Sequence, residues 1–255
     1  MLTAFVSDIH ANLEALESVL ADIEQRSPDR VVCLGDVVNY GPDPAACLRG
    51  VRSLDLCLMG NHEEAVLGEP IGFNPVAAEA ARWTRSVLLP GFLSDGSKSA
   101  NWAFVSTLRL KHQEDGMLLV HASPRAPTTE YLLPSDADPI LGEPSPKLVE
   151  CFGLVDRVCF VGHTHLPGVF AGPAAFLSAG QLHNEFRVRK GEKAIINVGS
   201  VGQPRDRNPK ACYATFDGEL VQYHRLAYNV RKTRDKVLAA KGLPDWCGLR
   251  LLKGE

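Results

Sequence analysis

The chain has 255 residues, of which 45% are hydrophobic and 22% are charged, an ordinary composition for a globular protein. Its formal net charge of −3 supplies no general basic field, which argues against a stable nucleic-acid complex held by phosphate contacts. The first six residues, MLTAFV, contain no basic leader and are too few to span a membrane, so we expect a cytoplasmic protein with no membrane partner. Seven cysteines without a Cys-x-x-Cys pair argue against a disulfide framework.

Short apolar runs that are typical of buried strands recur along the chain. Between the first two runs lies a helical stripe of apolar residues, 13–23, which follows Asn12, a plausible N-cap. A strand, a helix and a second strand in this order form a parallel pair. The strand-like runs cover residues 2–7, 30–34, 55–59, 117–120, 158–161 and 194–198.

Three further helices are predicted, at residues 74–88, 145–152 with Gly153 as the stop, and 229–241. Asp217-Gly218 is a turn signal between two strand-like runs and predicts a hairpin late in the chain. Parallel strands with crossover helices, followed by meandering strands, favour an α/β (α+β) fold, a two-sheet mixed β-sandwich flanked by helices. No stretch has the composition of a linker, so we expect one domain over residues 1–255.

Five loops that follow strand-like runs carry side chains that bind metal ions. Because parallel strands of one sheet end at the same edge, side chains placed just after them meet in space although they are far apart in sequence. The clusters are Asp8-Ile9-His10, Gly35-Asp36, Gly60-Asn61-His62-Glu63, His121 and Gly162-His163-Thr164-His165. They predict a two-metal site at the carboxyl ends of the strands. The stretch 64–116 holds no such cluster, so we expect it to be an active-site wall or cap insertion.

The residue types indicate which ions bind and how. Asp8 and His10 are two residues apart and leave the same face of a strand that stays extended, while Asp36 has two oxygens with which to bridge two cations. We assign Asp8, His10, Asp36 and His165 to one ion, and Asp36, Asn61, His121 and His163 to the other. Mixed carboxylate, amide and imidazole ligands favour Mn, Fe, Zn, Co or Ni over Ca or Mg, with Mn the first choice in vitro.

The charge of such a site predicts its chemistry. Two divalent ions against two carboxylates leave a residual charge of about +2, which holds a phosphate group and lowers the pKa of a bridging water. The expected nucleophile is therefore a metal-bridging hydroxide. His62 is the candidate catalytic acid, oriented by Glu63 or another carboxylate. The sequence has neither a Gly-x-Ser-x-Gly elbow nor a Walker phosphate loop, which disfavours the competing hydrolase classes.

In their order along the chain, the five blocks resemble the calcineurin-like metallophosphoesterase superfamily, whose pattern is Asp-x-His, Gly-Asp, Gly-Asn-His-Asp/Glu, a lone His and Gly-His-x-His. The match runs from Ser7 to His165, and the later stretch 197–205, NVGSVGQPR, resembles a small prokaryotic phosphodiesterase and phosphatase branch. The resemblance implies a β-sandwich flanked by helices, two bound metals, and hydrolysis of phosphomonoesters or phosphodiesters.

Departures from the family pattern bear on the substrate. Tyr40 and Met59 stand where the protein Ser/Thr phosphatases of this superfamily carry arginines that clamp phosphate. A protein phosphatase is therefore disfavoured, and Arg125 and Arg205 are the candidate substrate-binding residues instead. Ala11 stands where many relatives have glycine, and it is strained if the backbone takes a positive φ there.

The leading hypothesis is a binuclear metal-dependent phosphoesterase that acts on a small organic phosphate ester, with a phosphodiesterase favoured because the arginine clamps are missing. The alternatives are a phosphomonoesterase, or a nucleotide hydrolase that cleaves, for example, dinucleoside polyphosphates and builds its base pocket from 64–116. Trp83 is then the ring to test for base stacking, although core packing is its expected role. A non-catalytic metal-binding scaffold is an alternative of another class.

Overall fold

The computed structural model describes residues 1–91, 96–137 and 144–255, and its strands form two six-stranded sheets. The strand order is β3-β2-β1-β11-β12-β9 in the first sheet and β4-β5-β6-β10-β7-β8 in the second. The first sheet contains β1 (Thr3–Val6), β2 (Arg30–Cys33), β3 (Leu56–Cys57), β9 (Glu185–Arg187), β11 (Ala211–Phe216) and β12 (Leu220–Leu226). The second contains β4 (Lys111–Glu114), β5 (Met117–Val120), β6 (Val158–Val161), β7 (Gly168–Ala171), β8 (Phe176–Ser178) and β10 (Ala194–Asn197).

Both sheets combine parallel and antiparallel pairs. In the first, β2 runs parallel to both β1 and β3, while β11, β12 and β9 add antiparallel pairs. In the second, β6 runs parallel to both β5 and β10, while β4, β7 and β8 pair antiparallel. Each sheet therefore contains three neighbouring parallel strands, β3-β2-β1 in the first and β5-β6-β10 in the second, whose carboxyl ends lie at one common edge.

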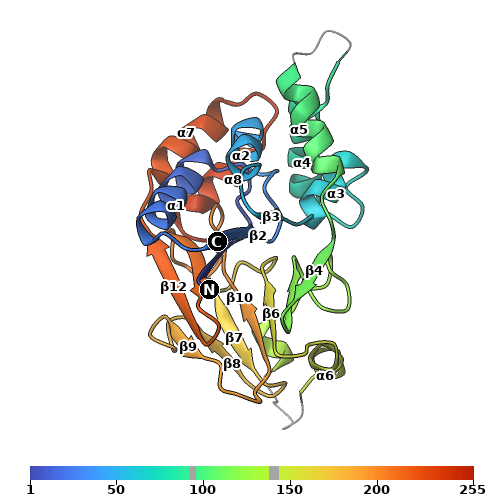
Figure 1. Cartoon of the computed structure of the whole chain (residues 1–255). Helices are drawn as coiled ribbons and strands as arrows, with labels where there is room; N and C mark the ends of the chain where they lie inside the picture. The colour runs from blue at the N-terminus through green and yellow to red at the C-terminus, as the bar shows by residue number, and fades with distance from the viewer. Residues whose placement is uncertain (92–95, 138–143) are drawn as a thin grey trace.

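Helices surround the two sheets (Figure 1). One group consists of α1, α2, α7 and α8, a second group of α3, α4 and α5 stands beyond β4, and α6 lies toward the opposite end of the molecule. Their bounds are α1 (Leu13–Arg26), α2 (Pro44–Val51), α3 (Asn61–Leu67), α4 (Pro75–Leu88), α5 (Gly96–Ser106), α6 (Pro146–Gly153), α7 (Val230–Ala239) and α8 (Trp246–Leu249), with 3-10 turns at Pro134–Asp136 and Arg250–Leu252. Within the described parts of the chain, no helix combines the length and apolar character that crossing a membrane requires.

Alternating side chains on the central strands create three apolar layers. Phe5 of β1 points between the sheets and stacks on Phe160 of β6, with ring centroids 4.0 Å apart. Its neighbour Val6 points outward into a cluster with Leu16 of α1. On the second sheet, Val120 points outward against Leu148 of α6. Because successive side chains of a strand face opposite sides, each sheet is covered on both faces, by the other sheet and by helices.

The architecture confirms the predicted fold class, a mixed two-sheet sandwich flanked by helices. The predicted cap Asn12 accepts a hydrogen bond from a backbone N–H in the first turn of α1, and Asn74, Ser145 and Asn229 cap α4, α6 and α7 in the same way. The Asp217-Gly218 signal sits in the hairpin between β11 and β12. The sequence argument missed the short helices α2, α3 and α8, the helix α5, and strands β4, β7, β8 and β9.

One part of the sequence argument was wrong. It placed all the ligand clusters after strands of a single sheet, whereas β1, β2 and β3 belong to the first sheet and β5 and β6 to the second. The clusters still converge, because the parallel strands of the two stacked sheets end at the same rim. The loop after β6 lies directly against the loop after β1, since the backbone N–H of His163 donates to the carboxylate of Asp8 over 3.0 Å.

Candidate metal centre

The loop after β1 carries Asp8 and His10 and leaves the extended conformation at once. Asp8 has φ 54° and His10 has φ 49°, so the strand does not stay extended through them and its alternation does not account for their meeting. The backbone N–H of Asp8 donates to Gly35 O and that of His10 to Asp36 O, over 3.0 and 2.9 Å. These bonds tie the loop to the one that follows β2, and they bring Asp8, His10 and Asp36 to one place.

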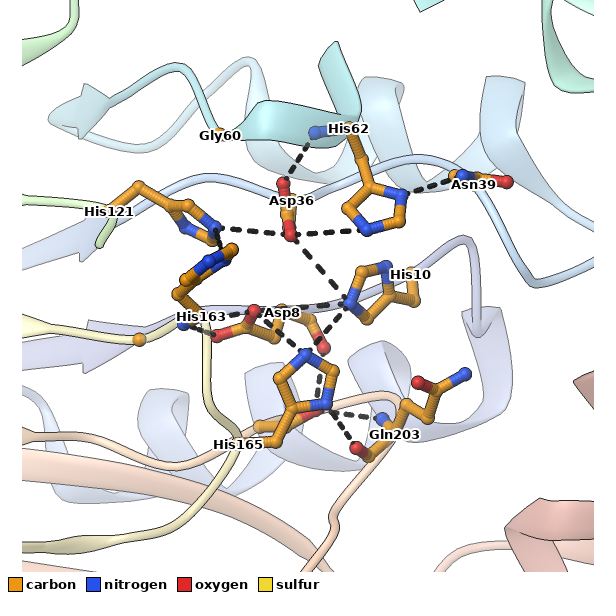
Figure 2. Close-up of polar contacts among 12 residues, drawn as sticks. Asp8, His10, Asp36, Asn39, Gly60, His62, His121, His163, His165 and Gln203 are labelled. Carbon is orange, nitrogen blue, oxygen red and sulfur yellow. Dashed lines mark hydrogen bonds and ion pairs between the residues drawn. The ribbon is translucent and has the colours of Figure 1, made fainter. Parts of the chain in front are cut away.

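Asp36 occupies the centre of the cluster, and its two oxygens face different groups (Figure 2). Oδ1 accepts from the backbone N–H of His62 over 3.0 Å, at the start of α3. Oδ2 lies 3.1 Å from Nε2 of His121, and 3.8 Å from Nε2 of both His10 and His62. The carboxylate therefore stands between histidines supplied by both sheets.

The second sheet supplies His121 after β5 and His163 and His165 after β6. Nε2 of His121 lies 3.2 Å from Nδ1 of His163 and 3.2 Å from Oδ1 of Asn61. Nε2 of His165 lies 3.1 Å from Oδ1 of Asp8. All of these side chains are buried, with Asn61 the most exposed at 9%.

Among the residues that the structure describes, three groups of side chains come close enough to hold an ion: Asp8, His10 and His165; His10, Asp36 and His62; and Asp36, His121 and His163. The ligand atoms of each group lie within 4.8 Å of one another. The first group contains three of the four residues assigned from the sequence to one ion, without Asp36, and the third contains three of the four assigned to the other, with Asn61 beside it. The second group links them, and it adds His62, which the sequence argument kept apart as a catalytic residue.

The hydrogen bonds of the imidazoles show that the centre fits cations. Nδ1 of His10 faces the carbonyl of Val38 over 3.3 Å and Nδ1 of His165 faces the carbonyl of Gln203 over 2.5 Å. Each Nδ1 must therefore carry a proton, which leaves a lone pair on each Nε2. These two Nε2 atoms lie only 3.1 Å apart, beside the Asp8 carboxylate. Two lone pairs repel at that distance unless a cation lies between them.

His121 and His163 each turn one ring nitrogen toward the centre. Nε2 of His121 and Nδ1 of His163 lie 3.2 Å apart, and Nε2 of His121 lies 3.1 Å from Oδ2 of Asp36. The opposite ring nitrogens, Nδ1 of His121 and Nε2 of His163, are buried and make no hydrogen bond. Imidazole nitrogens next to carboxylates form a donor set that suits transition-metal ions.

Electrostatics within the centre favour one positive charge next to Asp36. Burial alone would raise the pKa of Asp36, but the imidazoles of His121 and His62 outweigh it and hold the pKa well below its usual range. Burial would lower the pKa of His121, but Asp36 outweighs it and raises that pKa to about 9. His163, by contrast, has its pKa lowered to about 3 by burial and by His121. His121 thus attracts a proton at the place where the cluster favours a cation, while His163 stays neutral.

His62 is oriented by Asn39, and Glu63 does not contact its ring. The Asn39 side-chain oxygen accepts from the Tyr40 N–H over 2.7 Å, and its Nδ2 lies 3.4 Å from the Ala77 carbonyl. These contacts fix the amide so that Nδ2 donates to Nδ1 of His62 over 2.6 Å. The proton of the neutral ring is then on Nε2, the atom that faces Asp36. Burial, opposed by Asp36, lowers the pKa of His62 to about 4, so the ring is a neutral donor.

Glu63 instead fastens the start of α3 to the loop after β2. Its carboxylate accepts from the backbone N–H groups of Gly60, Asp36, Val37 and Val38 over 2.8–3.1 Å. Burial raises the pKa of Glu63 to about 7, with Asp36 contributing, while the N–H groups act in the opposite direction. Its role is to hold Asp36 and Asn61 in register with each other.

Two glycines of the sequence blocks leave room for the carboxylates. A Cβ on Gly60 would lie 2.1 Å from Oδ1 of Asp36, and a Cβ on Gly162 would lie 2.3 Å from Oδ2 of Asp8. Neither glycine has a positive φ, so their role is steric. The Gly-Asn-His and Gly-His-x-His blocks therefore begin with glycine because the backbone passes directly behind a metal-ligand candidate.

Sequence reasoning missed a group of residues that brace the centre. Asn197, at the end of β10, donates to the Gly162 carbonyl over 2.6 Å and to the Thr164 hydroxyl over 2.8 Å. The Ser200 hydroxyl donates to the Asp8 carbonyl over 2.8 Å. These residues lie in the stretch 197–205, which the sequence marked only through its resemblance to a family branch. Polar residues placed directly after an apolar strand were the available signal.

The two arginine candidates have different surroundings. Arg125 pairs with Glu150, and over 3.1 Å with Glu130, and no contact joins it to the metal-ligand candidates. Arg205 forms no ion pair with any described carboxylate, its Nε is buried without a partner, and its Nη2 donates to the Gln203 side chain over 2.9 Å. The charge of Arg205 contributes, after burial, to lowering the pKa of His165. The structure therefore places Arg205 beside the centre and turns Arg125 toward carboxylates.

Comparisons with known proteins agree with this geometry. A model of the calcineurin-like phosphoesterase family matches residues 1–167. An uncharacterized protein of Methanocaldococcus jannaschii is 36% identical over 99% of this chain and 98% of its own length. The crystal structure of a metallophosphoesterase from Sphaerobacter thermophilus is 33% identical, covers both chains fully and superimposes with a TM-score of 0.82. A symmetrical bis(5'-nucleosyl)-tetraphosphatase of Acidovorax is 34% identical over 46% of this chain and 42% of its own.

Proposed function

This chain belongs to the calcineurin-like phosphoesterase family and is a metal-dependent phosphoric ester hydrolase, and from that premise we propose that it hydrolyses a small phosphodiester at a centre of two divalent ions. The observation that carries the proposal is the position of Asp36. Its carboxylate lies between one group of metal-ligand candidates with His10 and another with His121 and His163. A buried carboxylate shared by two such groups suits a pair of ions better than one.

The side chains would hold the ions in the two groups described, with Asp8, His10 and His165 on one side of Asp36 and Asn61, His121 and His163 on the other. The mixture of oxygen and nitrogen donors favours Mn, Fe, Zn, Co or Ni, and Mn is our first choice in vitro. When bound, two such ions polarise phosphoryl oxygens and lower the pKa of water, which supplies the electrophile and the nucleophile of phosphoester hydrolysis.

Two side chains of the protein act on the substrate directly in this proposal. Arg205 carries a guanidinium with free donors at the edge of the centre, and it would bind a non-bridging phosphate oxygen. His62 presents its Nε2–H toward the centre and would donate a hydrogen bond to the leaving oxygen as negative charge develops there. Asn39 keeps that hydrogen in place by occupying Nδ1.

A diester is favoured over a monoester because of the charge of the site. A diester carries one negative charge and a monoester dianion two, and the two arginine clamps of the protein phosphatases are absent here. Tyr40 and Met59 stand at those positions, and their phenol and thioether side chains bring no positive charge. Of the two candidate arginines, only Arg205 lies beside the centre. We therefore propose small phosphate esters as the substrates, with phosphodiesters preferred. Hydrolysis of phosphomonoesters is the second candidate activity.

The direct test is hydrolysis of bis(p-nitrophenyl) phosphate and p-nitrophenyl phosphate by protein loaded with Mn, Co, Ni or Zn. We expect a higher kcat/KM for the diester, and two metal ions per chain by elemental analysis. Absence of turnover with every metal from mildly acid to alkaline pH would refute the proposed activity. A higher kcat/KM for the monoester would refute the diester preference alone.

A matched pair of arginine variants tests the phosphate contact. Arg205→Ala should raise KM for the diester about tenfold or more, because a charge-assisted hydrogen bond is worth about 1.5–3 kcal/mol. Arg125→Ala is the control, since Arg125 already pairs with Glu130 and Glu150, and it should leave KM unchanged. The opposite ranking would assign the phosphate to Arg125.

A further inference from the structure

A small cavity opens directly beside the metal centre. It has a volume of about 230 Å³, and His62 and Asn61 line it on the side of the centre. Its other walls come from Tyr40, the loop before α4 and the loop after β5. The lining residues of these walls are Tyr40, Gly72, Phe73, Asn74, Ala77 and Tyr131. Three of them are aromatic, and none is charged.

The aromatic rings are packed against the histidines of the centre. The centroid of Phe73 lies 4.8 Å from that of His62, and the centroid of Tyr40 lies 4.7 Å from it. Tyr131 lies over His163 on the other side, at 3.9 Å and an interplanar angle of 35°. Rings fixed by such contacts bind a flat partner without losing side-chain freedom.

Tyr131 also leaves much of its ring in water. It is 46% exposed, although it stands next to buried residues of the centre, and Lys147 holds its backbone carbonyl through a bond of 2.8 Å. Tyr40 on the facing wall is 7% exposed. An exposed aromatic face at the mouth of a polar centre is a surface on which a second ring can stack.

The polar groups of the cavity are few. Asn74 uses its Oδ1 to accept from the Ala77 N–H over 2.9 Å at the start of α4, and its Nδ2 remains available as a donor. A sugar ring needs many hydrogen-bonding partners, whereas a nucleobase needs a stacking surface and a few polar contacts at its edge. The volume also suits one planar group better than a peptide, since sites for drug-sized ligands measure about 300–1,000 Å³.

We propose that this cavity binds the nucleobase of a nucleotide whose phosphate lies at the metal centre, so that the substrate is a nucleoside phosphate ester. The inference rests on the proposed function for the position of the phosphate. Because the cavity opens beside His62, the nucleoside belongs to the leaving group. Phe73 and Tyr131 are the stacking rings, and Asn74 donates to the edge of the base.

Trp83, the aromatic residue that the sequence offered for stacking, shares an apolar cluster with Tyr40 and Phe73. Trp83 lies on α4 but donates its Nε1–H to the Lys241 carbonyl over 3.2 Å, and it packs near Leu243 and Cys247. It does not line the cavity. Its role is to attach α4 to the C-terminal segment, so it serves as a matched aromatic control.

The test compares two probes that differ only in the base, adenosine 5'-monophosphate and ribose 5-phosphate. Their dissociation constants are measured by isothermal titration calorimetry on the Mn-loaded full-length protein. We expect the nucleotide to bind about tenfold or more tightly, the range that stacking on a ring provides. Phe73→Leu and Tyr131→Leu, which keep apolar bulk without an aromatic face, should each reduce that ratio to within about threefold. Trp83→Leu should leave it unchanged.

Each result has one interpretation, because the two dissociation constants are compared within a single variant. Their ratio does not depend on whether the protein hydrolyses bis(p-nitrophenyl) phosphate. Equal affinity for the two probes in the unmodified protein overturns the inference, and so does a ratio that survives both leucine substitutions. Hydrolysis of bis(p-nitrophenyl) phosphate is measured in parallel. Turnover with equal probe affinities removes the base site and keeps the phosphodiesterase. A base-dependent affinity without turnover keeps the base site and removes the proposed activity.

Discussion

Backbone conformation at single residues aims the side chains of the centre. Asp8, His10, Asp36, His163 and His165 all have φ between 49° and 63°, in the left-handed region that costs an L residue about 1–2 kcal/mol. Ala11 joins them at φ 52°, so the strain foreseen at this alanine is present. The bonds that tie these loops together maintain it. Strain concentrated at the ligand candidates indicates that the centre is preorganised by the fold.

Gly60 provides the most direct test of this steric arrangement. In Gly60→Ala, the new Cβ would displace the Asp36 carboxylate, since it would lie 2.1 Å from Oδ1 and 2.6 Å from the backbone nitrogen. We expect metal affinity to fall about 10–100-fold, as it does when the support of a metal ligand is disturbed. Metal titration of the purified variant measures the effect.

Gly180→Ala is the control for that substitution. Gly180 is exposed, has no positive φ, and a Cβ there meets no atom within 4 Å. Its metal affinity should equal that of the unmodified protein. Unchanged metal affinity in Gly60→Ala would mean that Asp36 can move without loss of metal binding. That result would contradict the central position of Asp36 among the metal-ligand candidates.

A double-mutant cycle tests whether Asn39 acts through His62. Asn39→Ala removes the amide that holds the proton on Nε2, and we expect kcat to fall roughly tenfold with metal content and KM nearly unchanged. His62→Ala should lower kcat by roughly 10²–10³, the range for loss of a hydrogen-bond donor to developing negative charge. The double variant should be no slower than His62→Ala alone, because the amide has then lost its target. If the double variant lowered kcat by the product of the two separate factors, Asn39 would act independently of His62.

At the scale of elements, α7 is fastened to α1 by one buried carboxylate. Glu14 is 6% exposed, and its Oε1 lies 2.7 Å from Nζ of Lys236 and 3.1 Å from Nζ of Lys232. Its Oε2 accepts from the Thr233 hydroxyl over 3.0 Å. The sequence shows only a basic C-terminal helix, and the structure shows that two of its lysines reach this carboxylate.

Glu14→Gln should reduce the free energy of unfolding by about 2 kcal/mol at neutral pH, because charge-assisted hydrogen bonds are lost. Burial would raise the pKa of Glu14, but the bonds from Lys236, Lys232 and Thr233 outweigh it and lower the pKa below its usual 4.5. The folded state therefore binds this proton less readily than the unfolded state does, and the stabilisation is present above about pH 4.5 and disappears as the pH falls. Urea unfolding at pH 7 and pH 3.5 measures the difference in the free energy of unfolding between Glu14→Gln and the unmodified protein.

Glu17→Gln is the comparison for that variant, since Glu17 lies on the same helix and is exposed. It should change stability by less than about 0.5 kcal/mol at either pH. A Glu14→Gln deficit that persists at pH 3.5 would show that packing, and not the charge of Glu14, is responsible.

The elements that the sequence predicted are those with a local signal. The helix at Pro75–Leu88 begins with an asparagine cap and a proline, and both signals concern residues next to each other in the chain. The helix at Asn61–Leu67 has seven residues, and its first residues are the ligand block itself, so the metal pattern hid the helix. Strand β9 (Glu185–Arg187) is three residues long and depends on pairing with β12, which no local pattern encodes.

For the molecule as a whole, the sequence predicted which side chains meet but not which strands and sheets bring them together. The ligand blocks were recognisable because each follows a strand, and Asp36, His121 and His163 do come together. Their division between two sheets depends on pairings such as β1 with β11, which joins residues 3–5 to 214–216. Phe73 and Tyr131 lie far apart in the sequence and carry no motif, so the sequence alone could not predict the cavity that they line.

The position of the centre between the sheets predicts how metal affects stability. Asp8 and Asp36 follow strands of the first sheet, and His121, His163 and His165 follow strands of the second, so an ion bound there would link both. Ions that bind only the folded state add about 2.7 kcal/mol at one hundred times their dissociation constant. Removal with a chelator should therefore lower Tm by about 5–10 °C, measured by calorimetry, and Mn should restore it.

Asp36→Asn separates a specific link from a general salt effect, because it keeps the size of the side chain and removes the charge shared by both groups. Its Tm should respond little to chelator or to Mn. Hydrogen exchange should quicken on metal removal at the ends of β1, β2, β5 and β6, while the β11–β12 hairpin, away from the rim, stays protected. Identical melting and exchange with and without metal would mean that the two sheets hold together without ions, and that the lone pairs of His10 and His165 meet no cation between them.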